Sequence, residues 1–518
     1  MGYSKLESHR THELVEWHSR PLKKLALSDE HRLATMLHGL YVMQLDYSLS
    51  GTGRKKINWG ILKGTAVLFH EHKRISCKGI HSLKNLANLS ASQAARALAQ
   101  REIKAEDLLL DCLNQIGLRE NQVHAWVSLG KEHAIRTAQE LDRGAVQGIL
   151  HGLPIGVKDL FDTHDLPTNY GSPIYGNNHP VCDAVSVSLM REAGAIVLGK
   201  TVTTEFASFK PGPTCNPRNL DHTPGGSSSG SAAAVADCMV PLATGSQTAA
   251  SIIRPASYCG VVGYKPSYGK ISIGGVKSLS VSLDTLGVFG RTVSDVALGV
   301  AAMSADHDLA KIDPLEHKVR IGICRTSDFA MAQAETAAAL SLAGFAAKSF
   351  AKDGVSEITL PPSCATLTEI QTTIMLFEMA KSFTFEKLNH LDQISTTLQT
   401  IIQRGDAIKY SQYSEALTQA WRAGAELCQA FEDQFDILIA PSATGEAPHT
   451  IEQTGDPVFS RGWTLMGLPC INLTVTSGPK GLPVGVTLVA GPRRDRLLLS
   501  VAHALAQNLS DPLALNQA

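Results

Sequence analysis

The residues best suited to chemistry are a lysine after an apolar run and the serines of two downstream segments. Lys158 follows Leu153-Pro-Ile-Gly-Val157, a run typical of a buried strand. Residues 223–231 read Thr-Pro-Gly-Gly-Ser-Ser-Ser-Gly-Ser, and residues 245–256 carry two further serines. A lysine can accept a proton only when it is neutral, and burial favours the neutral form by lowering the pKa. These residue types could therefore support attack of a serine hydroxyl on a carbonyl carbon, with the lysine as base.

The Gly/Ser run at 223–231 has other interpretations, and the neighbouring sequence argues against several of them. A glycine-rich loop before a helix can bind phosphate on its backbone N–H groups. However, no Gly-Lys-Ser/Thr ends this run, so a Walker loop is excluded, and no Gly-x-Gly-x-x-Gly follows a strand. In addition, no histidine stands in an obvious triad context. One alternative stays open, in which these serines are only helix caps and turn residues.

Three segments taken together resemble the amidase signature family. They read GLPIGVKDLFDT at 152–163, TPGGSSSGSAAAVA at 223–236 and GSQTAASIIRPASYCGVVGYKPSYG at 245–269. The resemblance continues through SLDTLGVFGRTVSDVAL at 282–298 and GLPVGVTLVAG at 481–491, and it covers residues 88–510. The signal is specific because the lysine, the Gly/Ser loop and the second serine keep their order and spacing.

This resemblance implies a Lys-Ser-Ser catalytic triad that forms an acyl-enzyme. Lys158 would be the base, Ser227 the bridging serine and Ser251 the nucleophile. In the family the bridging serine follows a cis peptide, which here would join Gly226 to Ser227. The oxyanion would be held by the backbone N–H groups of Thr248, Ala249, Ala250 and Ser251. A supporting network would come from Gly226, Ser228 and Ser229, and neither a metal nor an organic cofactor is implied.

Four other charged residues near the motifs have competing interpretations. Lys200 also follows a predicted strand and is the alternative base. Asp159 and Glu205 are interpreted as structural partners rather than as acids in the reaction. Arg254 could bind a substrate carboxylate, although a salt bridge within the scaffold is the favoured interpretation.

The nucleophile segment departs from the commonest family pattern, Gly-Thr-Asp-Thr-Gly-Gly-Ser-Ile-Arg-x-Pro. Gln247 replaces the acid and Ile253 the arginine, so no charge is left without its partner, and an arginine follows at Arg254. Ala249 and Ala250 replace two glycines, which adds methyl groups beside the expected oxyanion site. These methyl groups could narrow the acyl pocket, but no catalytic side chain is lost.

The elements around these motifs alternate between helix and strand. Ser90 and Gln93 form a capping-box pattern that opens a helix. Helices are expected at 90–100, 106–116, 131–142, 185–195, 232–236 and 496–506, and the stretch 305–435 is expected to be mainly helical. Strands are expected at 125–129, 155–157, 195–198, 239–242, 437–440, 471–475 and 484–489. This alternation predicts an α/β fold, and the resemblance implies the amidase signature fold, a large twisted mixed sheet covered by helices on both faces.

Composition and charge describe an ordinary soluble protein with an unusual N-terminus. The 518 residues are 44% hydrophobic and 18% charged, with a formal net charge of −1, so neither a nucleic acid nor a membrane partner is expected. Residues 1–80 hold 13 Lys and Arg against 7 Asp and Glu. Residues 1–88 are interpreted as a basic extension of unknown role that could be partly disordered, and 89–518 as the amidase domain. Without a signal sequence or an apolar span, the cytoplasm is the expected location.

Three functions agree with these features. The favoured one is a stand-alone amidase that acts on a small-molecule carboxamide, with a homodimer plausible by family habit. The first alternative is the A-type component of a glutamyl-tRNA amidotransferase, against which the Gln247 and Ile253 replacements count. The second alternative is a catalytically weak or inactive scaffold subunit that has kept the fold.

Overall fold

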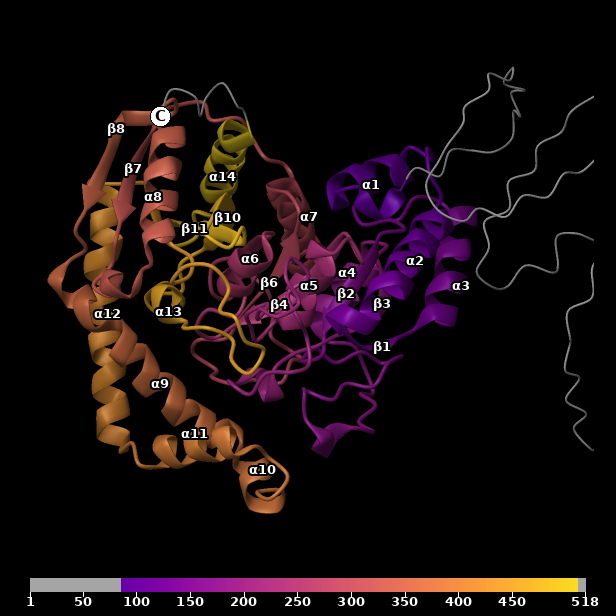
Figure 1. Ribbon diagram of the computed structural model, residues 1–518, viewed down its shortest axis with the longest axis horizontal. Coiled ribbons are helices and arrows are strands. Elements are labelled where there is room, and N and C mark those ends of the chain that lie inside the picture. The colour runs from indigo at the N-terminus through magenta and orange to yellow at the C-terminus, as the bar shows by residue number, and fades with distance from the viewer. Residues whose placement is uncertain (1–84, 511–518) are drawn as a thin grey trace, which may run out of the picture. The chain divides into compact units, whose positions relative to one another are not determined.

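The computed structural model describes residues 85–510, which build an eleven-stranded mixed sheet (Figure 1). The strand order across the sheet is β1-β3-β2-β4-β6-β5-β10-β11-β9-β7-β8. The strands are β1 (Trp126–Leu129), β2 (Pro154–Lys158), β3 (Ile196–Thr201), β4 (Leu242–Gln247), β5 (Val262–Lys265), β6 (Thr285–Gly290), β7 (Val319–Cys324), β8 (Ala351–Ile358), β9 (Ile437–Pro441), β10 (Cys470–Ser477) and β11 (Pro483–Ala490).

Strand direction explains why distant parts of the sequence meet at one edge of this sheet. Strand β2 lies between β3 and β4 and runs parallel to both. The carboxyl ends of parallel strands lie at the same edge, where α/β proteins commonly place their sites. Lys158 is the last residue of β2, and Gln247 is the last residue of β4. The segment that follows Gln247 therefore begins beside Lys158.

Helices cover both faces of the sheet. The side chains of strand β6 show that α7 lies on one face and the start of α6 on the other. Successive residues of a strand point to opposite faces. Val288 of β6 lies against Gly299 of α7, whereas Gly287 lies against Ile252, the residue just before α6. The helices are α1 (Ala91–Ala99), α2 (Ala105–Val123), α3 (Lys131–Arg143), α4 (Val185–Glu192), α5 (Ser229–Ala236), α6 (Ile253–Cys259), α7 (Val293–Ser304), α8 (Ala334–Ala347), α9 (Leu367–Ser382), α10 (Thr384–Asn389), α11 (Thr396–Asp406), α12 (Tyr410–Asp433), α13 (Val458–Leu465) and α14 (Asp495–Ser510).

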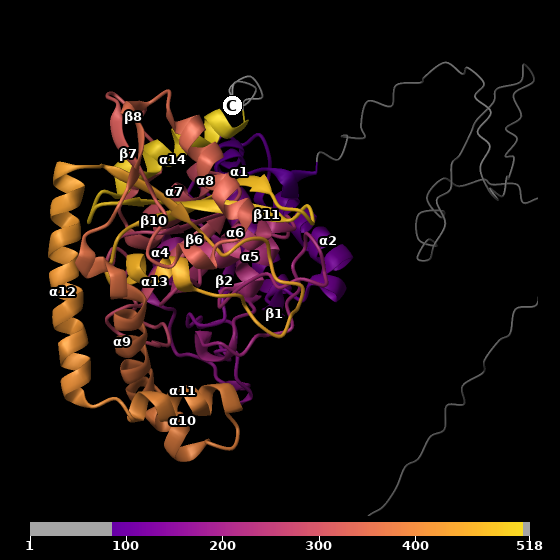
Figure 2. The ribbon, with the colours of Figure 1, turned by 60° about the vertical axis from the view of Figure 1, so that its left-hand side comes forward.

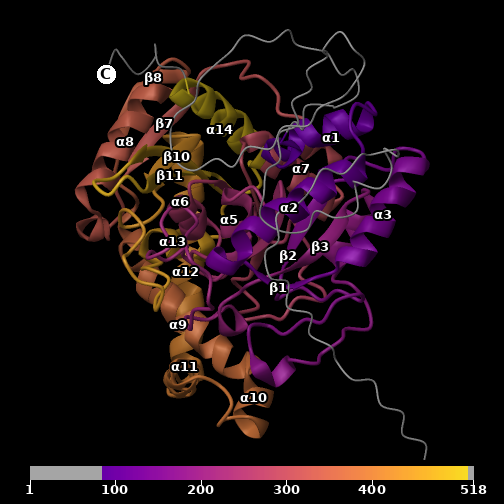
Figure 3. The same ribbon diagram turned by 45° about the vertical axis from the view of Figure 1, so that its right-hand side comes forward.

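Two groups of helices lie at different parts of the sheet. Helices α2 and α3 contact each other and pack on β2 and β3, while α1 contacts α7 (Figure 3). Helices α9 to α12 form a separate group, in which α10, α11 and α12 each contact α9 (Figure 2). Helix α13 also contacts α9, so this second group reaches toward the loops that follow β4 and β9.

Most of the predicted elements are confirmed. The capping box at α1 is present, since Ser90 Oγ accepts from Gln93 N at 3.2 Å and Gln93 Oε1 accepts from Ser90 N at 3.0 Å. The expected strand at 239–242 is misplaced, because β4 begins only at the last of these residues.

The expectation that 305–435 is mainly helical is confirmed by helices α8 to α12, but this stretch also contains strands β7 and β8, which were not predicted. Strand β8 lies at the edge of the sheet and has mostly exposed side chains. An exposed edge strand needs no alternation of apolar and polar residues, so its sequence carries no strand pattern. Strand β6 was not predicted from the sequence either.

Two further expectations from the sequence concern the N-terminal extension and the absence of a membrane-spanning segment. The proposed extension, residues 1–88, falls almost entirely outside the described residues, and its role stays a prediction. Within 85–510, no helix has the length and apolar character needed to cross a bilayer.

Candidate active site

Lys158 lies completely buried at the carboxyl end of β2 and contacts two serine hydroxyls. Its Nζ donates to Ser227 Oγ at 2.8 Å and to Ser246 Oγ at 2.8 Å. Burial lowers the pKa of Lys158 from 10.5 to about 7, and the nearby carboxylate of Asp284 acts in the opposite direction. The side chain can therefore be neutral near pH 7 and exchange protons with a neighbouring hydroxyl.

Ser227 is held in place by contacts on both sides of a cis peptide. The Gly226–Ser227 bond is cis, as the resemblance implied. The carbonyl of Gly226 accepts from Arg254 Nη2 at 2.7 Å, and the carbonyl of Ser227 accepts from Thr204 N at 3.2 Å. The buried Ser227 hydroxyl is thus fixed against Lys158 by its own backbone.

The next two serines of the loop, Ser228 and Ser229, form hydrogen bonds with the backbone of neighbouring segments. Ser228 Oγ accepts from Ser246 N and donates to Ser246 O, both at 3.4 Å. Ser229 Oγ donates to Val202 O at 3.3 Å. These contacts join the Gly/Ser loop to β4 and to the residue after β3.

Gln247 anchors the segment that carries Ser251. Its Oε1 accepts from the N–H groups of Ile252 and Ile253, at 2.9 and 3.0 Å. Its Nε2 donates to Thr464 Oγ1 at 3.0 Å. The amide that replaces the family's acid therefore satisfies two N–H groups at the start of α6 without a charge.

Residues 248–251, called here the nucleophile turn, connect β4 to α6. Two of its carbonyls accept side-chain hydrogen bonds: Thr248 O accepts from Gln371 Nε2 at 2.9 Å, and Ala249 O accepts from Thr464 Oγ1 at 2.7 Å. In contrast, the four backbone N–H groups of the turn donate to no acceptor within 85–510. The turn therefore has free donors beside Ser251, which is only half-buried.

Asp284 and Ser246 also belong to this site, although sequence reasoning did not single them out. Asp284 Oδ1 accepts from Thr248 Oγ1 at 2.5 Å, and its Oδ2 accepts from Ser278 Oγ at 2.8 Å. Burial raises the pKa of Asp284 above its ordinary value. Both residues lie inside motifs that resemble the family, so the motifs were the available signal.

Lys200, the alternative base, lies in a different environment. Its Nζ donates to Phe161 O and to Thr168 Oγ1, each at 2.6 Å, and lies 3.6 Å from Asp159 Oδ1. Burial lowers its pKa to about 8. The structure does not bring Lys200 into contact with Ser227 or Ser251.

Two acidic residues occupy structural positions, as their interpretation required. Asp159 pairs with Lys200 and accepts from Asn169 N at 3.1 Å. Glu205 accepts from the backbone N–H of Ser395 at 2.9 Å and from its hydroxyl.

The expected salt bridge of Arg254 is wrong, because its guanidinium contacts neutral oxygens. It donates to Gly226 O and Gly455 O, each at 2.7 Å, and to Thr454 Oγ1 at 3.0 Å. A planar guanidinium can reach several carbonyls at once. Here it joins the cis peptide to the loop that precedes α13.

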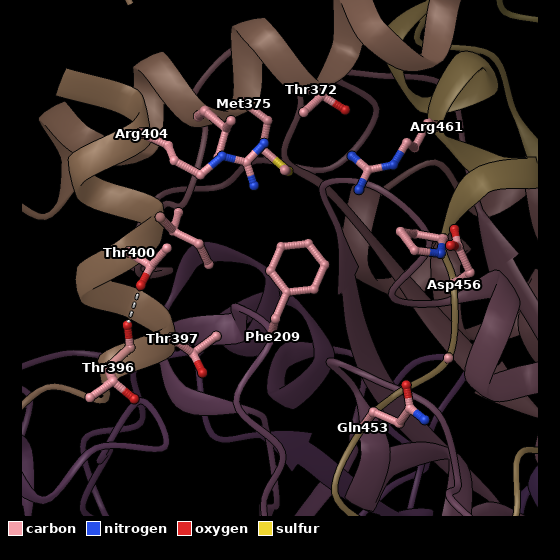
Figure 4. A pocket seen from close by; sticks show the side chains of 14 residues that line it. Phe209, Thr372, Met375, Thr396, Thr397, Thr400, Arg404, Gln453, Asp456 and Arg461 are labelled. Carbon is pink, nitrogen blue, oxygen red and sulfur yellow. Dashed lines mark hydrogen bonds between the residues drawn. The ribbon is translucent and has the colours of Figure 1, made fainter. Parts of the chain in front are cut away.

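A cavity of about 670 Å³ lies between α9, α11 and the start of α13 (Figure 4), and its lining contains no residue of the nucleophile turn. Its wall includes Phe209, Met375, Arg404, Gly455, Asp456 and Arg461. Hydrogen bonds connect this wall to the nucleophile turn through Gln371 and to the cis peptide through Arg254. Gly455 accepts from Arg254, and Arg461 Nη1 donates at 2.5 Å to Gln371, whose amide holds the Thr248 carbonyl.

The match to known families agrees with this geometry. Residues 107–499 match the amidase family model, so this chain belongs to the amidase family. Solved structures with the same fold include peptide amidase from Stenotrophomonas maltophilia, at 26% identity and a TM-score of 0.71 over 81% of this chain and 97% of that chain. They also include 6-aminohexanoate cyclic dimer hydrolase, at 26% identity and a TM-score of 0.74 over 82% and 98%. This chain therefore belongs to the class of hydrolases that act on carbon–nitrogen bonds.

Relatives found by sequence are A subunits of an amidotransferase and not the stand-alone amidases that the sequence analysis favoured. The A subunit of glutamyl-tRNA(Gln) amidotransferase from Agathobacter rectalis is 29% identical over 477 residues, covering 81% of this chain and 94% of the relative. The chloroplastic/mitochondrial A subunit of the same enzyme from Vitis vinifera is 31% identical over 478 residues, covering 80% and 86%. The expected stand-alone branch is thus not confirmed.

Proposed function

We propose that this chain hydrolyses a carboxamide through Lys158, Ser227 and Ser251. The observation that carries the proposal is the 2.8 Å contact between the buried Lys158 Nζ and Ser227 Oγ. Because burial lowers the pKa of Lys158 to about 7, the amine is available as a base at neutral pH. Ser251, which is half-buried, supplies the attacking hydroxyl, and the nucleophile turn supplies the N–H donors.

The first half of the reaction breaks the carbon–nitrogen bond. Neutral Lys158 accepts the proton of Ser227, and Ser227 takes the proton of Ser251. Ser251 Oγ then bonds to the amide carbon, while the N–H groups of the nucleophile turn hold the negative oxygen. The proton returns through Ser227 to the leaving nitrogen, the carbon–nitrogen bond breaks, and an ester on Ser251 is left.

The second half restores the enzyme. Water gives a proton to the same relay and attacks the ester carbon, and the carbon–oxygen bond to Ser251 breaks. The products are a carboxylic acid and an amine or ammonia, and Ser251 regains its proton.

The role of Lys158 is tested by replacing it and measuring amide hydrolysis. Lys158→Ala should lower kcat/KM for a hydrolysed amide by about 100-fold to 10,000-fold, the range expected for loss of a general base. Lys352→Ala removes an exposed lysine from the edge strand β8 and serves as the control. A folded Lys158→Ala protein with wild-type activity would refute the proposal, and circular dichroism would establish that it is folded.

The A-type component of a glutamyl-tRNA amidotransferase is a second candidate function, and the sequence relatives support it. These relatives match most of both chains. In this case the same three residues would release ammonia from glutamine, and the chain would work in a complex rather than alone.

Two measurements distinguish the candidates. Turnover of simple amides by the isolated chain, without glutaminase activity, would support the stand-alone amidase. Glutamine hydrolysis that appears only with a B-type partner, together with co-elution of the two chains, would support the amidotransferase. Size-exclusion chromatography with light scattering would also test the proposed homodimer.

A further inference from the structure

The 670 Å³ cavity between α9, α11 and α13 has two arginines on its wall and a single acidic side chain. Arg404 extends from α11 and Arg461 from α13, and Figure 4 shows both side chains reaching into the same opening. Asp456 is the acidic side chain of the lining. Its Oδ1 accepts from Val458 N at 2.9 Å, in a local turn at the start of α13. The wall therefore carries a net positive charge.

Neither arginine is neutralised by an ion pair within 85–510. Arg461 donates to the neutral Gln371 Oε1, and Arg404 donates to no acceptor in that part of the chain. Burial lowers the pKa of Arg461; among nearby charges, Asp456 raises it and the positive charge of Arg404 lowers it further. Two guanidinium groups that face one cavity repel each other, and an anion between them would relieve this repulsion.

The position of the cavity connects this charge to the reaction. Gln371 contacts Arg461 with its oxygen and Thr248 O with its nitrogen, so one side chain separates the arginine from the nucleophile turn. On the other side, Gly455 of the wall is held by Arg254, which also holds Gly226. One side chain thus separates the cavity wall from Thr248, and another separates it from Gly226.

The rest of the lining favours a short hydrocarbon segment. Phe209, Met375 and Leu376 supply apolar surface, while threonines at 396, 397 and 400 supply hydroxyls near Arg404. An apolar wall that ends in two arginines is complementary to an aliphatic chain that ends in a carboxylate.

We infer that this cavity selects carboxamides whose acyl part ends in a carboxylate, bound between Arg404 and Arg461. The inference rests on the proposed function, because it names the substrate class of the same site. The scissile amide would lie at Ser251, and the carboxylate at the opposite end of a short aliphatic chain.

Binding to the Ser251→Ala protein tests this inference without any turnover. Isothermal titration calorimetry would compare adipamate, which is the monoamide of adipic acid, with hexanamide, its neutral analogue. Adipamate should bind at least about 10-fold more tightly, as charge-assisted hydrogen bonds predict. Glutaramate and longer monoamides would establish the preferred chain length.

Variants of the arginines show where the preference arises. Adding Arg404→Met or Arg461→Met to Ser251→Ala should remove most of the preference for adipamate and leave hexanamide binding nearly unchanged. Arg422→Met, on the exposed part of α12, changes the net charge equally and should keep the preference.

The outcomes separate this inference from the proposed function. Equal binding of each monoamide and its neutral analogue, or a preference that survives both arginine substitutions, would overturn the inference. Hydrolysis of neutral amides by the wild-type protein would still support the proposed function in that case. Conversely, a charge preference in a protein without hydrolytic activity would support the binding site and count against the proposed reaction.

Discussion

At the scale of single residues, the partners of a buried lysine decide its role. Lys158, Lys200 and Lys265 are all 0% exposed. Lys265 donates to two backbone carbonyls, at 2.6 and 3.1 Å. Lys200 donates to one carbonyl and to the hydroxyl of Thr168, and it lies 3.6 Å from a carboxylate oxygen. Carbonyl and carboxylate oxygens only accept, so they favour a donating lysine. Lys158 contacts two hydroxyls, which can donate as well as accept, and it alone of the three can pass a proton to and from serine.

The pH dependence of the reaction should follow the titration of Lys158. The base must be neutral, so kcat/KM should rise with pH through a limb with an apparent pKa of about 7. Activity should fall as the pH drops below this value, because Lys158 becomes protonated. Initial rates at pH values on both sides of neutrality would measure the limb, with circular dichroism as a check on folding. A rate that does not change across this range would contradict the assignment.

At the scale of elements, the nucleophile turn depends on Gln247. Gln247→Leu would leave the N–H groups of Ile252 and Ile253 without their acceptor. Each buried, unsatisfied donor costs about 1–3 kcal/mol, so the free energy of unfolding should decrease by at least about 1 kcal/mol. Urea denaturation would measure this change.

Gln419→Leu, on the exposed surface of α12, is the matched control, because it makes the same replacement where no backbone N–H depends on the amide. This variant should retain more stability and more activity than Gln247→Leu. An unchanged urea midpoint in Gln247→Leu would show that the turn does not rely on this side chain.

The same scale shows what the sequence could predict. Strand β2 was predictable because Ile155 and Val157 lie in a short apolar run, and family motifs indicated Lys158 and Ser227. Strand β4 reads LATGSQ, in which burial on both faces overrides poor strand propensity. The contacts of Ser246, Asp284 and Gln371 could not be predicted, since they join residues far apart in the chain.

At the scale of the whole molecule, every contact described for the site lies between residues 154 and 464. A chain that begins at residue 85 should therefore keep the kcat/KM and thermal midpoint of the full protein. Both quantities can be measured on the two proteins side by side. A large loss of activity in the shorter protein would assign residues 1–84 a role in catalysis, and a lower midpoint would assign them a role in stability.

The central claim is that Ser251 is an activated nucleophile, and intact-mass spectrometry with a fluorophosphonate tests it most directly. The wild-type protein should gain the mass of a single adduct, and Ser251→Ala protein should gain none. An adduct of equal yield on Ser251→Ala, or no adduct on the folded wild-type protein, would contradict the account.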